Sequence, residues 1–403
     1  MENLTGKCVV LGVCGGIAAY KMANVASALR KTGAEVHVIM TENATQFISP
    51  ITFETLTNHK CMVDTFDRNF QFDVAHVSIA KAADLFVIAP ATANVMAKLS
   101  YGLADDMLTT TVLAARCPKI IAPAMNTGML ENPATQDNIA RLKKFGFEII
   151  EPASGLLACM DEGKGKLPPE DEIMDHIMRR LACEQDMRGL RVTVTAGPTQ
   201  EAMDPVRYIT NRSTGRMGYA IARAAMLRGA DVTLISGPVS ITPPRFVNVV
   251  PIRSAQDMFE AVQAAFPQMD ILIKAAAVAD YRPASVADEK IKKKDGDMSI
   301  ALERTNDIIA WCGQNRREGQ FLCGFSMETQ NMLENSRAKL VRKGLDMIAA
   351  NNVKVAGAGF GVDTNVLTLI TADEEIELPL MSKDAAAHQL LDTILRRRGG
   401  SAK

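Results

Sequence analysis

The sequence predicts an α/β protein with two doubly wound, Rossmann-like domains, and three observations lead to this prediction. Continuous apolar runs of strand length alternate with amphipathic helical segments, which is typical of parallel sheets covered on both faces. Two of these runs, within residues 7–16 and 191–199, end in glycine, where a phosphate can approach backbone N–H groups. A polar segment, residues 184–189, separates the two halves, and we place the boundary near residue 187.

The first predicted domain, residues 1–186, has five apolar runs and helical patterns between and after them. Its predicted strands are Cys8–Gly12, Glu35–Met40, Leu85–Ala89, Ile120–Pro123 and Glu148–Glu151. Its predicted helices include Ala18–Lys31, Asp137–Phe145 and Glu170–Leu181. Since the runs are continuous rather than alternating, we expect a sheet that is buried on both faces.

The second predicted domain, residues 187–403, repeats this pattern. Its predicted strands are Val192–Ala196, Val232–Ser236, Ile271–Ala275, Phe321–Phe325, Met347–Ala350 and Val366–Ile370. Its predicted helices are Met217–Arg228, Ala255–Ala265 and Thr329–Arg342. A chain of 403 residues is long enough for two or three such domains.

The composition narrows the class of protein. The net charge of −1 argues against nucleic acid or an anionic membrane as the main partner. The eight cysteines form no CxxC pair and no zinc-type spacing, so reduced thiols in a cytoplasmic protein are expected. The first apolar run spans about six residues, which is too short for a signal peptide or a membrane span.

Two predicted strand ends of the first half carry small and amide side chains, in Ala89-Pro-Ala-Thr-Ala-Asn94 and Ala122-Pro-Ala-Met-Asn126. Open α/β sheets bind ligands at such ends, and these residues suit a flat ring with hydrogen-bonding edges. The first turn lacks the GxGxxG pattern, and Glu42 stands between Thr41 and Asn43, which suit a phosphate better than a ribose. These residues argue against a nicotinamide cofactor, which remains an alternative.

Two further side chains are candidates for chemistry. His76 lies in an apolar stretch, where a histidine is more often structural than catalytic. Cys159 lies in a glycine-rich segment, residues 154–166, that has no periodicity. Such segments are typical of functional loops or lids.

Four motifs of the first half resemble the flavin-dependent cysteine decarboxylase family, and within it the phosphopantothenoylcysteine decarboxylases. They are Gly-Gly-Ile-Ala-Ala-Tyr-Lys, Ala-Pro-Ala-Thr-Ala-Asn, Pro-Ala-Met-Asn and Leu-Ala-Cys-x-Asp-x-Gly-x-Gly-Lys. The resemblance implies a flavodoxin-like, homo-oligomeric flavin-containing cysteine decarboxylase fold with bound FMN. The flavin contacts that it implies are Gly16, Ile17, Thr41, Asn43, Ala91, Thr92, Ala93, Asn94 and Ala124.

The same resemblance assigns the active site to His76, Asn126 and Cys159. FMN accepts electrons from the substrate, so that CO2 can leave. Cys159 fits the acid that returns a proton, and His76 fits a base or an orienting group. Asn126 can bind the carboxylate. Two positions depart from the family. Cys14 stands where the family has serine or threonine, and Met160 stands where it frequently has glycine.

The second half carries polar residues in two segments. Asn211 and Ser213 precede a helix that begins near Gly215, and they suit either an N-cap or an anion site at the helix N-terminus. Asp280, at a predicted strand end, can bind Mg2+ or a ribose. The basic run that begins at Lys290 can neutralise a triphosphate or form a solvated loop. No GxxxxGK[ST] motif is present, so a P-loop enzyme is not expected.

These segments resemble phosphopantothenate–cysteine ligases, and both matches together resemble the bacterial family in which the two enzymes are fused in this order. The bacterial ligases use CTP. The resemblance implies Mg2+ at Asp280, and Asn306 stands where the family commonly has proline. The nucleotide contacts that it implies are Lys274, Ala275, Ala276, Asp280, Lys290, Asn306, Asp307, Ile308, Ile309, Phe325, Lys339 and Lys343. Lys339 and Lys343 are four residues apart, so they share a helix face.

The function that the resemblance implies is coenzyme A biosynthesis by ligation and then decarboxylation. The carboxylate of 4′-phosphopantothenate attacks CTP to give an acyl-cytidylate, and the amine of L-cysteine displaces CMP. Lys290 is expected to offset phosphate charge and Asn211 to hold the mixed anhydride. The first half then converts 4′-phospho-N-pantothenoylcysteine to 4′-phosphopantetheine. The family also implies homo-oligomers, with ligase dimers, decarboxylase trimers and a dodecamer as one combined assembly.

Two alternatives belong to other classes. A flavin-fold regulatory protein of the phosphatase-inhibitory type is disfavoured, because binding alone needs no acid–base set such as His76, Asn126 and Cys159. A nicotinamide oxidoreductase is disfavoured by the missing GxGxxG motif. The yellow colour of a purified flavoprotein would separate the flavin hypotheses from the nicotinamide one.

Overall fold

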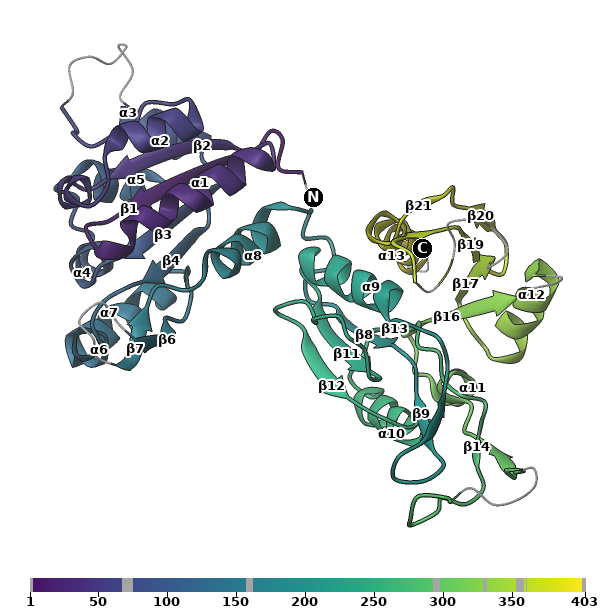
Figure 1. Cartoon of the computed structure of the whole chain (residues 1–403). Helices are drawn as coiled ribbons and strands as arrows, with labels where there is room; N and C mark the ends of the chain where they lie inside the picture. Colours follow the sequence, from purple (N-terminus) through teal and green to yellow (C-terminus); the bar gives the residue numbers. More distant parts are fainter. Residues whose placement is uncertain are drawn as a thin grey trace. The chain divides into compact units, whose positions relative to one another are not determined.

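The computed structural model describes residues 3–66, 75–156, 162–292, 298–328, 332–352, 359 and 361–400. The chain forms two compact units, Met1–Glu184 and Gln185–Lys403, each with its own sheet and its own core (Figure 1). Of the helices within the described ranges, none is both long and apolar enough to cross a membrane.

The first unit is built on a five-stranded parallel sheet with the order β2-β1-β3-β4-β5. In terms of chain order this is 2-1-3-4-5, the flavodoxin-like order, whose topological switch point lies between β1 and β3. The strands are β1 (Cys8–Val13), β2 (Glu35–Met40), β3 (Leu85–Ala91), β4 (Lys119–Pro123) and β5 (Phe147–Ile149). The doubly wound, flavodoxin-like prediction for the first half is therefore confirmed.

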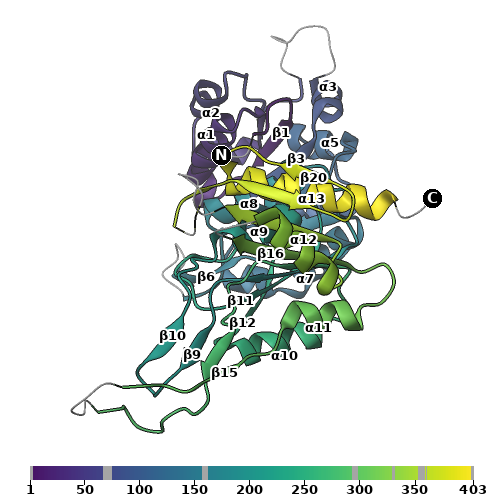
Figure 2. The ribbon, with the colours of Figure 1, turned by 90° about the vertical axis from the view of Figure 1, so that its right-hand side faces the viewer.

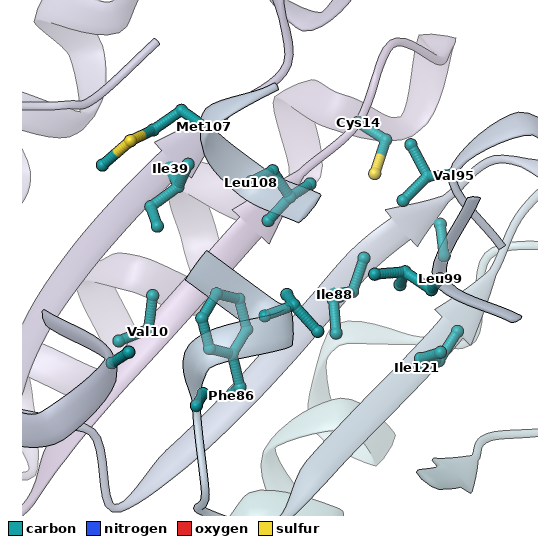
Figure 3. Packing of buried hydrophobic residues seen from close by; sticks show 14 of the residues in the cluster. Val10, Cys14, Ile39, Phe86, Ile88, Val95, Leu99, Met107, Leu108 and Ile121 are labelled. Carbon is teal, nitrogen blue, oxygen red and sulfur yellow. The ribbon is translucent and has the colours of Figure 1, made fainter. Parts of the chain in front are cut away.

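Helices cover both faces of this sheet. Helices α1 (Met22–Lys31) and α8 (Glu170–Leu181) contact each other and strands β2 and β3. On the other face, side chains of the strands pack against α4 (Ala93–Tyr101) and α5 (Met107–Ala114), as Figure 3 shows. Further helices of this unit are α2 (Pro50–Thr57), α3 (Ala75–Ala82), α6 (Thr127–Glu131) and α7 (Pro133–Lys144).

A glycine in β1 lies under a side chain of α5. A β-carbon on Gly12 would lie 2.5 Å from Cδ1 of Leu108, so a larger residue at this position would force the Leu108 side chain to move. Leu108 fills the space together with Val10, Phe86 and Ile88, all of which are buried (Figure 3). The apolar runs in the sequence are thus strands buried on both faces.

Three predicted elements in the first half differ most from those observed. The predicted helix Ala18–Lys31 is divided into a short 3-10 helix, η1 (Ile17–Lys21), and α1. The predicted helix Asp137–Phe145 is the second part of α7, which begins at Pro133 after the N-cap Asn132. The predicted strand Glu148–Glu151 is β5, shifted toward the N-terminus.

The second unit has an eight-stranded mixed sheet with the order β12-β11-β8-β13-β16-β17-β19-β20. Its parallel part is ordered 3-2-1-4-5-6 in the chain, the arrangement of dinucleotide-binding folds, with a switch point between β8 and β13. The parallel strands are β8 (Arg191–Ala196), β11 (Asp231–Ser236), β12 (Asn248–Pro251), β13 (Ile271–Lys274), β16 (Phe321–Glu328) and β17 (Met347–Asn352). This confirms the second doubly wound domain.

The last two strands of this sheet, β19 (Leu367–Ile370) and β20 (Glu375–Glu377), run antiparallel. Helices α9 (Arg216–Leu227) and α13 (Lys383–Gly400) contact each other on one face. Helices α10 (Ala255–Ala265), α11 (Ile308–Asn315) and α12 (Met332–Arg342) contribute to the core on the other. Residue 329, where we predicted that α12 begins, lies outside the described ranges.

Short antiparallel pairs extend from the second unit. The hairpin of β9 (Gln200–Ala202) and β10 (Tyr208–Thr210) contacts the pair of β14 (Tyr281–Pro283) and β15 (Leu302–Arg304), and they project together beyond the sheet (Figures 1 and 2). A third small pair joins β18 (Thr364–Asn365) to β21 (Met381–Ser382). None of these short strands was predicted from the sequence.

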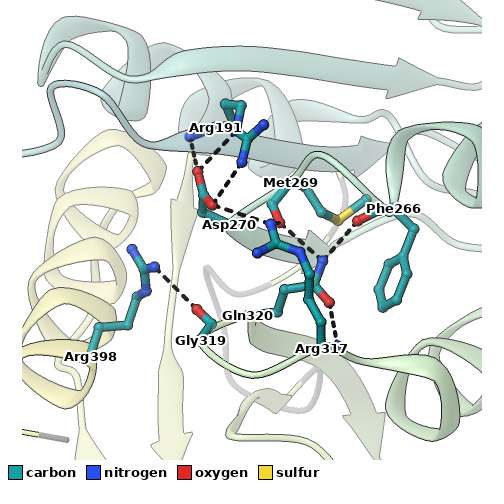
Figure 4. A network of polar contacts seen from close by, with 8 residues as sticks. All are labelled: Arg191, Phe266, Met269, Asp270, Arg317, Gly319, Gln320 and Arg398. Atoms are coloured by element: carbon teal, nitrogen blue, oxygen red, sulfur yellow. Dashed lines mark hydrogen bonds and ion pairs between the residues drawn. The ribbon is translucent and has the colours of Figure 1, made fainter. Parts of the chain in front are cut away.

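A polar network holds the edge of the second sheet where the strands begin (Figure 4). The backbone N–H and the guanidinium of Arg191 donate to Asp270, and Arg317 donates to the same carboxylate. Although burial opposes ionisation, these hydrogen bonds hold the pKa of Asp270 below its usual value. Arg398 of α13 donates to the carbonyl of Gly319 at this edge. Since open α/β sheets bind ligands at the carboxyl ends of their strands, we expect the ligand at the opposite edge.

Candidate active sites

The first unit has a cavity of about 480 Å³ where β1, β3 and β4 end. This is the topological switch point of the sheet, where open α/β folds bind ligands. The predicted residues that line it are Gly16, Ile17, Thr92, Ala93, Ala124 and Asn126. The residues that the predictions missed are Gly15, Ala18, Tyr20, Lys21, Met125, Met129, Leu156, Gly165, Lys166 and Leu167. Several of these, including Tyr20 and Lys21, belong to the quoted motifs.

Two of the predicted residues begin helices at the cavity. Thr92 is the N-cap of α4, and its hydroxyl oxygen accepts a hydrogen bond from the backbone N–H of Val95 at 3.3 Å. Asn126 is the N-cap of α6, and its side-chain oxygen accepts from the N–H of Gly128 at 2.8 Å. These hydrogen bonds hold both side chains at the N-termini of their helices, where backbone N–H groups favour anions.

The end of β2 packs against the glycine turn of β1. A β-carbon on Gly15 would lie 2.5 Å from Cβ of Asn43, so the two segments touch. Thr41 is buried, and its hydroxyl oxygen has no hydrogen-bond partner among the described residues. An orphaned buried hydroxyl is costly, so this position fits a ligand that carries hydrogen-bonding oxygens. Thr41 and Asn43 flank the cavity without lining it.

The other predicted flavin contacts have backbone or surface positions. Ala91 is buried in β3, and its carbonyl oxygen accepts from the N–H of Ala124 at 3.0 Å, which joins two of the strand-end loops. Asn94 is exposed in the first turn of α4. Neither residue lines the cavity.

Two of the predicted catalytic residues are not brought into this cavity by the described structure. His76 is half-buried in the first turn of α3 and does not line it. Cys159 lies outside the described residues, between β6 (Ala153–Leu156) and β7 (Glu162–Lys166). The β6–β7 hairpin nevertheless reaches the site, because the N–H of Met125 donates to the carbonyl of Gly165 at 3.0 Å.

The departure at Cys14 has a structural explanation. Cys14 is fully buried in the core of the first unit, near Val95 (Figure 3). Burial raises the pKa of its thiol to about 12, with a smaller contribution from Asp106 and an opposing hydrogen bond from the backbone at Thr92. The thiol therefore stays protonated and serves packing. Met160 lies outside the described residues.

The second unit has a cavity of about 430 Å³ at the ends of β13 and β16 and the start of α9. It also lies at a topological switch point. The predicted residues that line it are Asn211, Lys274, Ala275, Ala276, Asp280 and Phe325. Ser213, named with Asn211 as a candidate for an anion site, also lines it. Arg216, Ser326, Asn351, Asn365 and Lys383 line it too but had not been predicted as contacts.

Asn211 is held toward this cavity and does not cap the helix. Its side-chain N–H donates to the carbonyl of Ala277 at 3.0 Å. The N-cap of α9 is Gly215, with a φ of 77°, a left-handed conformation that favours glycine. The N-cap alternative for Asn211 is therefore wrong. Ser213 accepts a hydrogen bond from the N–H of Gly215 at 3.4 Å.

Lys274 is the central charge of the second cavity. Burial and the charges of Lys343 and Lys339 lower its pKa, while Asp307 and Asp280 oppose the shift. Lys343 forms an ion pair with Asp307 at 3.0 Å. It is the first residue after the C-terminal end of α12. Its N–H still donates to the carbonyl of Lys339, so the predicted shared helix face is retained. A partly desolvated cation in such a cluster suits an anionic ligand.

The remaining predicted contacts surround this cluster. Asp307 caps α11 by accepting from the N–H of Ala310, and Ile308 and Ile309 are buried in the core, so only their backbones can face a ligand. Asn306 donates to the side chain of Gln256 at 3.1 Å. Asp280 is exposed immediately before β14, several residues beyond the end of β13, so its predicted strand-end position was wrong.

Lys290 is exposed and does not line the cavity within the described residues. Its loop is fastened to the β9–β10 hairpin, because the N–H of Ile291 donates to Asp204 at 3.1 Å. The N–H of Ala287 also donates to the carbonyl of Met203 at 3.0 Å. The hairpin and the lysine loop therefore form one assembly.

Comparisons with known proteins agree with this two-part architecture. The Flavoprotein family model matches residues 1–182, and the model of the DNA/pantothenate metabolism flavoprotein C-terminal domain matches residues 187–397. The coenzyme A biosynthesis bifunctional protein CoaBC of Bacillus subtilis is 48% identical over 395 residues, which cover 97% of each chain. The protein of the same name from Escherichia coli is 42% identical over 398 residues, 98% of each chain.

Among solved structures, the C-terminal domain of a coenzyme A biosynthesis bifunctional protein CoaBC is 42% identical, with a TM-score of 0.45 and coverage of 52% of this chain and 96% of that one. Because the Bacillus subtilis and Escherichia coli relatives are 48% and 42% identical over 97% and 98% of this chain, the chain belongs to the family of bifunctional coenzyme A biosynthesis proteins. It has a flavoprotein domain in its first half and a DNA/pantothenate metabolism flavoprotein C-terminal domain in its second.

Proposed function

We propose that the two cavities catalyse consecutive reactions in coenzyme A biosynthesis. Residues 187–403 join L-cysteine to 4′-phosphopantothenate with CTP, and residues 1–186 decarboxylate the resulting 4′-phospho-N-pantothenoylcysteine to 4′-phosphopantetheine with FMN. The observation that carries the proposal is the presence of two chemically different cavities, each at the switch point of its own sheet. One is mostly apolar with small residues, and the other contains Lys274, Asp280 and Asn211.

The first cavity fits FMN. The orphaned hydroxyl of Thr41 and the N-terminus of α4 offer hydrogen bonds to a phosphate, and small residues such as Gly16, Ala93 and Ala124 leave room for a flat ring. FMN supplies a two-electron acceptor, which makes loss of CO2 from a cysteine carboxylate feasible. Asn126 is placed to bind that carboxylate. Cys159 returns a proton, and His76 acts before CO2 leaves.

The second cavity fits a nucleoside triphosphate with Mg2+. Lys274, supported by Lys339 and Lys343, attracts the phosphates, and the Asp280 carboxylate offers oxygen to Mg2+. Lys290 offsets the charge that develops as the substrate carboxylate attacks CTP and pyrophosphate leaves. Asn211 holds the acyl-cytidylate until the cysteine amine displaces CMP.

We also propose that the chain acts as a homo-oligomer, with trimers of the first half, dimers of the second and a dodecamer as the combined assembly. Large apolar side chains around the first cavity support this, since Ile17, Tyr20, Met129 and Leu156 are 50–61% exposed. His76 and Lys290 lie outside the cavities of a single chain, as expected for sites completed by a neighbouring copy. The cytoplasmic location stays a prediction from composition.

Two partial reactions test the assignment. Given 4′-phospho-N-pantothenoylcysteine alone, the full chain should release CO2 without CTP. Given 4′-phosphopantothenate, L-cysteine, CTP and Mg2+, the variant His76→Asn should stop at the amide, because only the decarboxylation is blocked. If CO2 release required CTP, or if His76→Asn formed no amide, the division of labour would be wrong.

Cys159→Ser distinguishes the proton donor from the earlier steps. A hydroxyl is a far weaker acid than a thiol, so this variant should keep its flavin and release CO2 but fail to complete the return of electrons and a proton. An oxidised enethiol product and bleached flavin should accumulate, as measured by mass and absorbance. Full turnover by Cys159→Ser would remove Cys159 from this role.

A further inference from the structure

A cluster of metal-ligating side chains lies at the edge of the first sheet where its strands begin. Cys8 is the first residue of β1 and Glu35 the first of β2, and the parallel register places them opposite each other. Since residues i and i+2 of a strand face the same side, His37 lies beside Glu35 on that side. In the parts of the chain that the structure describes, these three form the one group of three or more such residues whose ligand atoms all lie within 4.8 Å of one another.

The side chains converge on one carboxylate oxygen. Nε2 of His37 lies 2.9 Å from Oε1 of Glu35, and Nε2 of His59 lies 3.9 Å from the same oxygen. The two imidazole rings are 4.3 Å apart between centroids. Cys8 closes the cluster on the protein side and is only 6% exposed, while the Glu35 side chain is 54% exposed. Solvent therefore reaches the cluster from the Glu35 side.

The donor set is that of a borderline divalent cation. Thiolate sulfur, imidazole nitrogen and carboxylate oxygen are the ligands of Zn2+, and in a tetrahedral site they lie about 3.5 Å from one another. The His37 and Glu35 ligand atoms are 2.9 Å apart and all three ligand atoms lie within 4.8 Å of one another, and the exposed Glu35 side chain has room to adjust. The sequence shows no zinc-binding motif here, because the three ligands come from two strands that are distant in the chain.

Binding of Zn2+ at this cluster requires that the Cys8 thiol gives up its proton, because a coordinating thiol is deprotonated. The carboxylates of Glu35 and Asp84 would then face a positive charge, since Asp84 accepts a hydrogen bond from the N–H of Cys8 at 2.8 Å.

We propose that Cys8, Glu35 and His37 bind a Zn2+-type divalent cation at a structural site that ties β1 to β2, with the fourth position taken by water or His59. The site is separate from the proposed flavin site. Cys8 and Val13 are the two ends of β1, which places them about 16 Å apart along the strand. The cation should therefore stabilise the first unit without taking part in decarboxylation.

The test is a titration of the full, flavin-loaded and reduced protein with Zn2+ and with Co2+, whose thiolate complexes absorb in the near ultraviolet. One site per chain is expected, with a thiolate band in the Co2+ difference spectrum. Cys8→Ser should abolish this band, and Glu35→Gln and His37→Gln should each weaken Zn2+ binding by about tenfold or more. The matched controls are Cys183→Ser and His176→Gln, since His176 forms a comparable pair with Glu148 at 2.6 Å.

Thermal unfolding gives a second readout that does not depend on the buried cysteine. Zn2+ should raise the unfolding temperature of the unsubstituted protein but not that of Glu35→Gln, an exposed change that leaves the core intact. Equal Zn2+ affinity in Cys8→Ser and Cys183→Ser, or a Co2+ spectrum of the unsubstituted protein without a thiolate band, would overturn the proposal. The cluster would then be an ordinary ion pair beside a buried thiol.

Discussion

At the scale of single residues, the orphaned hydroxyl of Thr41 links the sequence motif to a physical requirement. Its cost in the flavin-free protein is about 1 kcal/mol or more, and a phosphate oxygen would remove that cost. Thr41→Val keeps the shape and deletes the hydroxyl. We therefore expect the flavin-free variant to be more stable to heat than the unsubstituted protein, yet to bind FMN more weakly.

Thr111→Val is the matched control for this prediction. Thr111 is also buried, but its hydroxyl donates to the carbonyl of Met107 at 2.6 Å and does not face the flavin cavity. FMN affinity, measured by fluorescence quenching, should be unchanged in this variant. If Thr41→Val bound FMN as tightly as the unsubstituted protein, Thr41 would have no role in holding the phosphate.

Lys274 predicts the pH dependence of the ligase reaction. Because its pKa is lowered, it loses its positive charge at a lower pH than an ordinary lysine, and its attraction for phosphates is lost as the pH rises. We expect kcat/KM for CTP, measured as pyrophosphate release, to fall in the alkaline range. Pyrophosphate release precedes the attack of the cysteine amine, so the ionisation of that amine does not interfere.

Lys274→Arg checks the assignment, since a guanidinium stays charged throughout this range. The alkaline decline should move to higher pH in this variant, even where its overall rate is lower. An unchanged decline in Lys274→Arg would mean that another group titrates.

The residue scale also shows what the sequence can and cannot reveal. Asn211 was recognised as a polar residue at a helix start, but its hydrogen bond to Ala277, 66 positions away, decides that it is not the cap. Cys14 was recognised only as a departure from the family, whereas its position in the core makes it a packing residue. Partners distant in the sequence settled both cases.

At the scale of elements, Asp204 couples the β9–β10 hairpin to the lysine loop. Its buried carboxylate accepts hydrogen bonds from the backbone of Val206, Arg207 and Ile291, and the guanidinium of Arg207 holds its pKa well below its usual range. Asp204→Asn removes the charge and loosens the loop that carries Lys290. Pyrophosphate release should fall about tenfold, less than the roughly 10²-fold loss expected for Lys290→Gln.

Asp270→Asn provides the comparison for this change. Asp270 organises a similar network with Arg191 and Arg317, but at the opposite edge of the same sheet (Figure 4). It should lower thermal stability and leave the ligase rate constants of the folded protein nearly unchanged. If Asp204→Asn and Asp270→Asn behaved alike in pyrophosphate release, anchoring of the lysine loop would not explain the role of the hairpin.

A helix or strand can be predicted from the sequence when residues close to it in the chain determine it. Continuous apolar runs predicted all five strands of the first sheet and most strands of the second, because burial on both faces demands such runs. The parallel edge strand β12 was missed, because its residues are partly exposed. Helix α7 was placed too late because its N-cap, Asn132, and Pro133 were overlooked. The direction of β19 and the pairs β9–β10 and β14–β15 depend on pairing between distant segments, so no local pattern predicts them.

At the scale of the whole molecule, the order of strands distinguishes the halves. The 2-1-3-4-5 sheet of the first unit and the 3-2-1-4-5-6 arrangement of the second place their cavities at separate switch points. The apolar runs indicated two such domains but could not give the strand order, which depends on tertiary pairing. The family resemblance supplied the residues, and the fold explains why most of them gather at two edges.

The products of a single reaction mixture show whether one chain performs both reactions. The full, flavin-loaded protein is incubated with 4′-phosphopantothenate, L-cysteine, CTP and Mg2+, and the products are identified by mass. We expect 4′-phosphopantetheine, CO2, CMP and pyrophosphate, and none of these without CTP. Accumulation of the amide with no CO2, or no consumption of CTP at all, would mean that the chain does not perform both reactions.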